Sequence, residues 1–246
     1  MSTLCIIPAR GGSKGIKLKN LQKLNEKPLL EYTINAAKKS KKIDRIIVST
    51  DNQKISNFSK SLGIDVPFLR PKIFSRDSST TIDVVKHTLQ FLKEKQSYVP
   101  EIITILQPTS PLRNFKNIDR SVRLLKKNNC TSVIEVRELK KHPFASFKIQ
   151  NNFLKPFSKN FEKYSQRQSF PELFYPTGSV YTFWNTTLTK YNSLYGTKIF
   201  PIIEKNEYVD IDTPFDLFVS EMILKNYQNF MKTRFKSNKK IEFKNI

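Results

Sequence analysis

The chain of 246 residues is poor in the residues that build redox and zinc sites, with only two cysteines and two histidines. Cys5 and Cys130 form no CxxC pair and have no histidine nearby, so neither a disulfide framework nor a metal site is implied. His87 falls in a predicted helix and His142 beside a proline, and neither has a partner that indicates general-base catalysis. No apolar run approaches the length of a membrane span, and the first residues lack the apolar region of a signal peptide. We therefore expect a cytoplasmic protein with no membrane partner.

Acidic residues are also scarce, with 21 Asp and Glu against 43 Lys and Arg, which gives a formal net charge of +22. Clustered cations can bind nucleic acid by releasing its counterions. Here the cations are spread over every segment, as the pairs Lys38-Lys39, Lys41-Lys42, Lys126-Lys127, Lys140-Lys141 and Lys239-Lys240 illustrate. Such pairs are typical of a solvated surface, so we do not expect nucleic acid to be the ligand.

Short β-branched runs alternate with longer amphipathic stretches, which predicts an α/β fold with a mostly parallel sheet. Strands are expected at 3–8, 45–50, 66–69, 101–107, 131–137, 178–184 and 199–203. Helices are expected at 28–40, 52–62, 79–96, 115–127 and about 213–231. The chain is long enough for one large domain, which we assign to residues 1–231, with residues 232–246 as a basic tail.

Residues 139–175 break this rhythm. They contain many aromatic side chains and a segment from Phe147 to Leu154 that can form a hairpin around Asn151-Asn152. An excursion of this kind from a sheet is either a lid or a dimerisation arm.

Three of the six glycines lie together, in the segment Arg10-Gly11-Gly12-Ser13-Lys14-Gly15 that follows an apolar run. Glycines let backbone N–H groups approach an anion and adopt positive φ, and Arg10, Lys14 and Lys19 add positive charge. The spacing matches neither a P-loop nor a dinucleotide fingerprint. The segment therefore predicts a phosphate-binding loop of another type.

Asp210 and Asp212 are separated by one apolar residue, after a predicted strand and before a predicted helix. On an extended chain, residues i and i+2 point to the same side, so both carboxylates can face one Mg²⁺ ion. Taken alone, an Asp-x-Asp pair is more often a turn or a helix-capping device. The helix that follows has Thr213 as its expected N-cap, with Asp216 three residues later.

The loop Pro8–Ile16 with Lys19-Asn20 resembles a motif of the acylneuraminate cytidylyltransferases, the CMP-sialic acid synthetases and their legionaminate and pseudaminate relatives. Four further stretches match in order: Ile46–Asp51, Leu106–Arg113, Arg167-Gln168 with Pro176–Tyr181, and Asp210–Thr213. The resemblance covers roughly residues 3–225. It implies a Rossmann-like nucleotidyltransferase fold, a three-layer sandwich with a small dimerisation excursion, and hence a homodimer.

The resemblance also implies roles for individual residues. Catalytic roles fall to Arg10, Lys14, Lys19 and Asp212, and metal binding to Asp210 and Asp212. Nucleotide contacts fall to Arg10, Gly11, Gly12, Ser13, Lys14, Asn20, Arg70 and Thr80, although on spacing alone Thr80 is equally a helix cap. Sugar contacts fall to Gln107, Arg167, Gln168 and Tyr175. Tyr175 stands where sialate-specific members carry an arginine, and Thr177 where an asparagine is common, which favours a sugar other than N-acetylneuraminate.

The implied reaction joins CTP to a nonulosonic acid and gives the CMP-sugar and pyrophosphate, with Mg²⁺ as cofactor. Three alternatives remain: a GTP-dependent legionaminate guanylyltransferase, a ketodeoxyoctonate cytidylyltransferase, and a non-catalytic protein that binds phosphate or nucleic acid. Nucleic-acid binding would weaken steeply with salt and would not depend on Asp210 or Asp212.

Overall fold

The computed structural model describes residues 1–13, 15–159, 170–206 and 209–234, and it is built around a six-stranded sheet. The strands are β1 (Thr3–Pro8), β4 (Arg45–Ser49), β5 (Ile102–Ile105), β6 (Ser132–Glu138), β9 (Phe174–Trp184) and β10 (Ile199–Ile203). Their order is β10-β6-β9-β5-β1-β4, and β9 alone runs antiparallel to its two neighbours. The expectation of a mostly parallel sheet is therefore confirmed.

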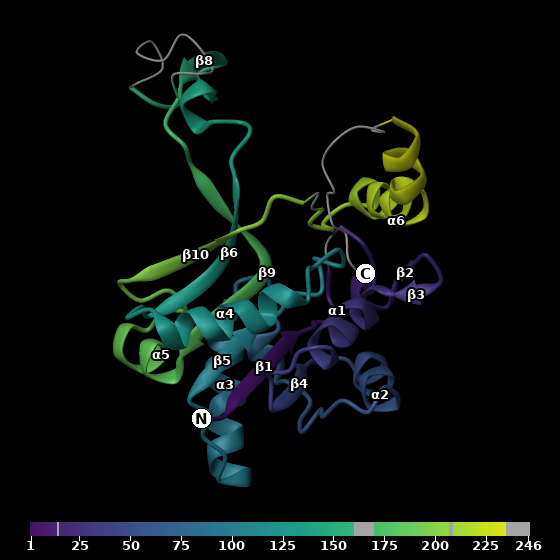
Figure 1. Cartoon of the computed structure of the whole chain (residues 1–246), viewed down its shortest axis with the longest axis vertical. Coiled ribbons are helices and arrows are strands. Elements are labelled where there is room, and N and C mark those ends of the chain that lie inside the picture. The colour runs from purple at the N-terminus through teal and green to yellow at the C-terminus, as the bar shows by residue number, and fades with distance from the viewer. Residues whose placement is uncertain (14, 160–169, 207–208, 235–246) are drawn as a thin grey trace.

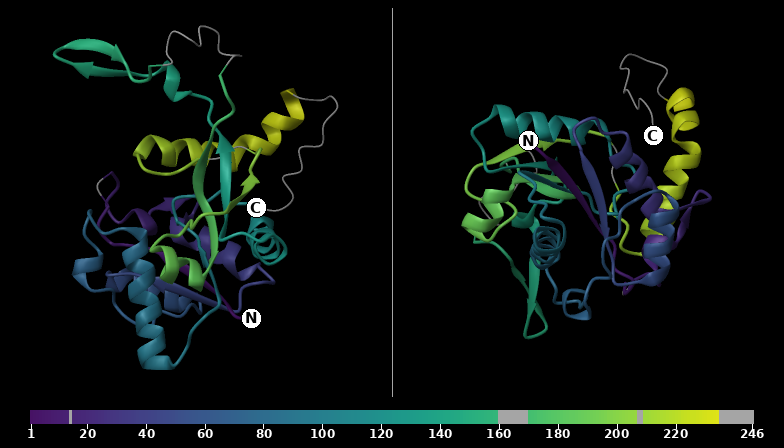
Figure 2. Two further views of the ribbon diagram at one scale, coloured as in Figure 1. Left: turned by 90° about the vertical axis from the view of Figure 1, so that its left-hand side faces the viewer. Right: turned by 90° about the horizontal axis from the view of Figure 1, so that it is seen from below.

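Helices cover both faces of this sheet (Figures 1 and 2). Because side chains of a strand alternate between the two faces, β1 contributes to two cores. Cys5 and Ile7 pack with α1 (Leu29–Lys38), α2 (Gln53–Ser61) and α4 (Lys116–Lys127). Leu4 and Ile6 pack with α3 (Thr81–Gln96) and α5 (Asn185–Tyr191). This arrangement is the three-layer α/β sandwich that the sequence predicts.

A slender arm projects from the sheet (Figure 1). Strands β6 and β9 run together toward it, and it carries the short helix η3 (Pro143–Ala145) and a hairpin of β7 (Phe147–Gln150) and β8 (Phe153–Pro156). The hairpin turns at Asn151 and Asn152, whose φ angles are 52° and 64°. Asparagine tolerates this left-handed backbone better than most residues, which is why the pair favours a turn here. The hairpin expected around these two asparagines is confirmed.

Three smaller elements complete the described chain. A two-stranded ribbon of β2 (Lys23–Leu24) and β3 (Lys27–Pro28) follows the one-turn helix η1 (Lys19–Leu21), and η2 (Lys72–Phe74) precedes α3. The last helix, α6 (Pro214–Arg234), extends three residues beyond the predicted end at 231. Its start is as predicted, because the Thr213 and Asp216 side chains exchange hydrogen bonds with each other's backbone N–H.

Two local predictions were wrong. Residues 66–69 form no strand. The described bridges here are isolated, one at Asp65 just before the segment and one at Leu69 within it, because Pro67 between them has no N–H to donate to a ladder. Helix α5 was not predicted at all, because its sequence is rich in threonine and asparagine, which have low helix propensity. No helix in the described ranges has the length and apolar character that a membrane crossing requires.

Candidate active site

The loop after β1 is held in place by two polar side chains. The Gly11 N–H donates to Asp51 Oδ1 at 2.8 Å, and Asn20 Nδ2 donates to the Arg10 carbonyl at 2.9 Å. Asp51 follows β4 and Asn20 lies in η1, so elements on both sides of the loop fix its backbone. Asn20 is buried, and its described contact supports the loop.

The expectation of positive φ in this loop was wrong, because the described glycines with positive φ are Gly63, Gly178 and Gly196. The loop uses glycine for close approach instead. A Cβ on Gly15 would lie 2.3 Å from the carbonyl oxygen of Asp212, and one on Gly11 would lie 2.7 Å from the Asn52 side chain. Gly15 therefore lets the loop pack directly against the backbone of the Asp-x-Asp segment.

Lys19 joins these two segments a second time. Its Nζ donates to the Ile211 carbonyl at 2.7 Å and to Asp212 Oδ1 at 3.0 Å, across 193 residues of sequence to Asp212. The Lys19 side chain is largely buried, with 13% exposure, whereas the Asp212 side chain is 71% exposed. The ammonium group is therefore fixed, and the carboxylate beside it faces solvent.

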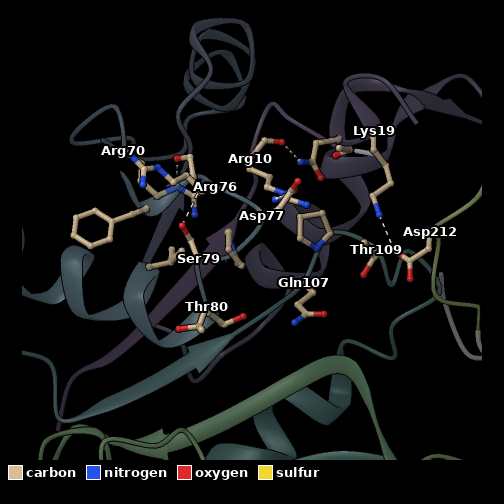
Figure 3. A pocket seen from close by; sticks show the side chains of 18 of the residues that line it. Arg10, Lys19, Arg70, Arg76, Asp77, Ser79, Thr80, Gln107, Thr109 and Asp212 are labelled. Carbon is tan, nitrogen blue, oxygen red and sulfur yellow. Dashed lines mark hydrogen bonds and ion pairs between the residues drawn. The ribbon is translucent and has the colours of Figure 1, made fainter. Parts of the chain in front are cut away.

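A cavity of about 510 Å³ opens between the loop, η2, the start of α3 and the end of β5 (Figure 3). Predicted site residues that line it are Arg10, Ser13, Lys19, Asn20, Arg70, Thr80, Gln107 and Asp212. In Figure 3, Lys19 and Asp212 lie on one side of the cavity, Arg70 and Arg76 lie on the other, and Arg10 lies between them. The volume is in the range of small-molecule and cofactor sites.

Gly11 and Gly12 are part of the loop but not of the lining. Lys14, Arg167 and Gln168 fall outside the described residues. Tyr175 is placed on β9 opposite Arg137 of β6, where these strands approach the arm, and it also does not line the cavity.

Arg70 is the buried cation of the cavity, with 4% exposure. Its N–H donates to the Thr50 carbonyl at 2.7 Å and its Nε to Ser75 Oγ at 3.2 Å. Burial lowers the pKa of Arg70, which the nearby Asp51 carboxylate partly offsets. An arginine remains charged in spite of such a shift, so a desolvated positive charge is held at this end of the cavity.

Thr80 is the N-cap of α3, as its spacing indicates. Its hydroxyl accepts from the Asp83 N–H at 3.2 Å, and the Asp83 carboxylate accepts from both the hydroxyl and the N–H of Thr80 at 2.8 Å. This capping box starts α3 while Thr80 also lines the cavity. The two hydrogen bonds from Thr80 hold the pKa of Asp83 below its usual range.

Arg10 and Asp77 form an ion pair of 2.8 Å at the cavity, with side-chain exposures of 37% and 53%. An exposed pair of this kind contributes only about 0–1 kcal/mol. A polyanionic ligand can therefore exchange with the Asp77 carboxylate at small cost.

Asp210 and Asp212 follow a loop rather than a strand, which corrects the prediction, because β10 ends at Ile203. The two acids nevertheless share one environment, as expected for residues i and i+2. Both are exposed, whereas Ile211 between them is fully buried. Partial burial raises the pKa of Asp210, which the Thr109 hydroxyl opposes and the Asp212 carboxylate reinforces. The two carboxylates thus repel each other electrostatically, and the positive charge of Lys19 acts on both.

Asp210 and Asp212 offer only two side-chain ligands to a metal ion. Within the described ranges, no group of three or more His, Cys, Asp or Glu side chains is arranged to hold a metal ion. Mg²⁺ takes oxygen ligands, keeps several waters, and is usually held by one or two carboxylates together with substrate phosphates. The Asp210 and Asp212 carboxylates, of which Asp212 lines the cavity, fit that mode of binding.

Gln107 follows β5 and lines the cavity, in agreement with the rule that polar residues at the carboxyl ends of parallel strands face the ligand crevice. Arg113 holds the backbone of Gln107 in place through two hydrogen bonds. Its Nη2 donates to the Gln107 carbonyl at 2.5 Å, and its Nε donates to the Ser179 carbonyl at 2.6 Å.

Two charged residues with a role at this site were not predicted. Arg76 lines the cavity next to Asp77, and Asp51 anchors the loop from the end of β4 without lining the cavity. The rule that polar residues at the carboxyl ends of parallel strands face the crevice applies to Asp51 as it does to Gln107, because Asp51 also follows a parallel strand. Arg76 carries no comparable signal, because it follows the short helix η2 rather than a strand.

A family model described as Cytidylyltransferase matches residues 4–246. The CMP-N,N'-diacetyllegionaminic acid synthase of Legionella pneumophila is 31% identical over 229 residues, covering 91% of this chain and 97% of that protein. The N-acylneuraminate cytidylyltransferase of Escherichia coli O18:K1:H7 is 32% identical over 92% of this chain and 53% of its own length. That of Streptococcus agalactiae serotype V is 30% identical over 87% of this chain. The chain spans about half the length of the streptococcal relative.

Solved structures show the same fold at low identity. A CMP-2-keto-3-deoxy-manno-octonic acid synthetase complexed with CTP has a TM-score of 0.67 at 14% identity, over 92% of this chain and all of that one. A 4-diphosphocytidyl-2C-methyl-D-erythritol synthase from Anaerococcus prevotii has a TM-score of 0.62 at 15% identity, over 91% of this chain and 98% of that one. With a family model that matches nearly its whole length, the chain belongs to the cytidylyltransferase family.

Proposed function

We propose that this protein transfers the cytidylyl group of CTP to a sialic-acid-like nonulosonic acid and releases pyrophosphate. The observation that carries the proposal is the contact of Lys19 with Asp212, which joins a cationic loop to the Asp-x-Asp segment at the edge of one cavity. Asp212 lines that cavity, and Asp210 does not. Nucleotidyl transfer needs both parts, because cations must balance the triphosphate while an acidic centre holds the metal. The names of the relatives, which make CMP-sialic and CMP-legionaminic acids, support the choice of substrates.

In this reaction a sugar hydroxyl oxygen attacks the α-phosphorus of CTP. A bond forms between that oxygen and the α-phosphorus, and the bond from the α-phosphorus to the bridging oxygen breaks. Pyrophosphate leaves with that bond's electron pair, and the hydroxyl proton passes to solvent water. Arg10 and Lys19 are placed to neutralise charge on the triphosphate, with Arg10 exchanging Asp77 for phosphate. Arg70 supplies a fixed, buried charge on the nucleotide side.

Asp210 and Asp212 would hold Mg²⁺ together with phosphate oxygens. The ion would supply Lewis-acid stabilisation of the charge that develops on the phosphate oxygens. Lys19 donates a hydrogen bond to the Asp212 carboxylate, so this cation would lie beside the reacting phosphates. Gln107, which lines the same cavity, is the described residue that we assign to the sugar.

The projecting arm supports a homodimer. Five of its apolar side chains are at least 47% exposed, a degree of exposure that a partner surface would relieve: Phe147, Ile149, Phe153, Leu154 and Phe157. We therefore expect the arm to pack on a second copy of the chain. Light scattering tests this directly: replacing Phe153 and Leu154 by serine should convert a dimer to a monomer, and a wild-type monomer at micromolar concentration would contradict it. We also propose that the enzyme acts in the cytoplasm, as expected from the sequence.

The function is tested by pyrophosphate release with Mg²⁺. CTP and GTP are crossed against N-acetylneuraminate, legionaminate, pseudaminate and ketodeoxyoctonate. Release with CTP and one nonulosonate, abolished in Asp212→Ala and kept in the distant surface variant Asp65→Asn, would support the proposal. Release with GTP alone would instead identify a guanylyltransferase. Binding of CTP without release for any pair would indicate a non-catalytic protein.

A further inference from the structure

Glu135 is a buried carboxylate at an irregularity of the central sheet. Its neighbours Ile134 and Val136 on β6 pair with Tyr181 and Pro176 on β9, so four residues of β9 lie opposite this single residue. Glu135 is only 2% exposed. A buried charged group is expensive unless its hydrogen bonds are satisfied, so its partners indicate why it is there.

Each carboxylate oxygen of Glu135 accepts one hydrogen bond. The Thr177 hydroxyl donates to Oε1 at 2.9 Å, and Asn117 Nδ2 donates to Oε2 at 2.8 Å. Asn117 also donates to Glu204 Oε2 at 2.9 Å, so it ties two acids to α4. The ionised carboxylate and the Glu135 carbonyl oxygen, which lies 3.3 Å from the Thr177 hydroxyl, can only accept, so the Thr177 hydroxyl proton points at Glu135.

That direction matters for the turn around Gly178. Because the Thr177 proton points at Glu135, a lone pair of its oxygen is available to the Ser179 N–H, which donates at 3.2 Å. Gly178 between them has a φ of +75°, and a Cβ there would lie 2.7 Å from Oε1 of Gln107. The turn therefore packs its backbone directly against the Gln107 side chain.

Gln107 is also tied to this turn through the backbone. Its N–H donates to the Gly178 carbonyl at 3.4 Å, and Arg113 bridges the Gln107 and Ser179 carbonyls. A continuous set of contacts thus runs from Glu135 through Thr177 and the Gly178 turn to Gln107 in the cavity.

We propose that Glu135 and Thr177 are positioning residues that set the orientation of Gln107 toward the sugar. This inference rests on the proposed function and adds to it a buried pair that does not line the cavity itself. The pair acts on the sugar side alone, because its contacts reach Gln107 and none of the described contacts of Glu135 or Thr177 involve Lys19 or Arg70.

The test compares Thr177→Val with Thr177→Ser. Valine keeps the shape but removes the hydroxyl, which leaves Glu135 Oε1 and the Ser179 N–H without this partner. Serine keeps the hydroxyl. We expect kcat/KM for the sugar to fall about ten-fold or more in Thr177→Val, because small misplacements of a binding group are costly, while KM for CTP stays within about two-fold. Thr177→Ser should keep most of the wild-type kcat/KM for the sugar. Melting temperatures of both variants report whether the fold is kept.

Equal losses for sugar and CTP, or equal behaviour of the valine and serine variants, would overturn the inference while leaving the proposed function in place. If Thr177→Val does not fold, Glu135→Gln replaces it, with the same sugar-specific loss expected and an unchanged sugar kcat/KM counting against the inference. Absence of turnover in the wild-type protein with every sugar would instead remove the proposed function, and this inference with it.

Discussion

Replacing Gly15 by alanine tests whether contact between the phosphate loop and the Asp-x-Asp segment is needed for turnover. The new Cβ would lie 2.3 Å from the Asp212 carbonyl oxygen, whereas Cβ contacts closer than 3.0 Å are essentially never seen. One of the two segments must therefore move by about 0.7 Å, the difference between these distances. A displacement near 1 Å at a reacting centre can cost about 10²-fold in rate.

We expect kcat/KM for CTP to fall about 10- to 100-fold in Gly15→Ala, which corresponds to about 1.4–2.7 kcal/mol of lost transition-state stabilisation. Gly12→Ala is the matched comparison, because it adds the same methyl group to the same loop with nothing within 4 Å. Its loss should be clearly smaller. Steady-state pyrophosphate release measures both variants. Wild-type kinetics in Gly15→Ala would refute the idea that the loop must touch Asp212.

Two further predictions concern stability. Thr80→Ala should lower the free energy of unfolding by about 1 kcal/mol, because it removes one half of the capping box of α3, whereas Thr80→Ser should keep the stability of the wild type. Urea titration of both variants measures the difference. Equal stability of the two variants would contradict the capping role. Burial raises the pKa of Glu135 above its usual 4.5, so its ionisation opposes folding. The free energy of unfolding of the wild type relative to Glu135→Gln should therefore be greatest below pH 4.5 and should decline as the pH rises through the raised pKa. Denaturation at several pH values measures this difference. A difference that does not change with pH would refute the raised pKa of Glu135.

The sequence predicts the parts of the site that depend on local pattern. A glycine-rich cationic loop after a buried strand, and Gln107 at the end of another strand, are both found at the cavity because parallel strands bring their carboxyl ends to one edge. The capping of α3 and α6 follows from Thr80, Thr213 and the acids three residues later.

Other parts depend on contacts between distant segments and carry no local signal. The Lys19 to Asp212 contact joins residues 193 apart, and the need for glycine at position 15 comes from a backbone that approaches from that same distant segment. The irregular pairing opposite Glu135 reflects a polar cluster from α4, β6 and β9, whereas the sequence around it reads as an ordinary strand. Asp210 was expected after a strand, but β10 ends at Ile203.

The most direct test of the account is a single assay of pyrophosphate release by wild type and Asp212→Ala, with Mg²⁺, CTP and the four candidate sugars. The account predicts release with CTP and one nonulosonic acid, and its loss in Asp212→Ala despite an unchanged melting temperature. Full activity in Asp212→Ala would contradict the assignment of the acidic pair, and the absence of release by a wild-type protein that binds CTP would contradict the proposed reaction itself.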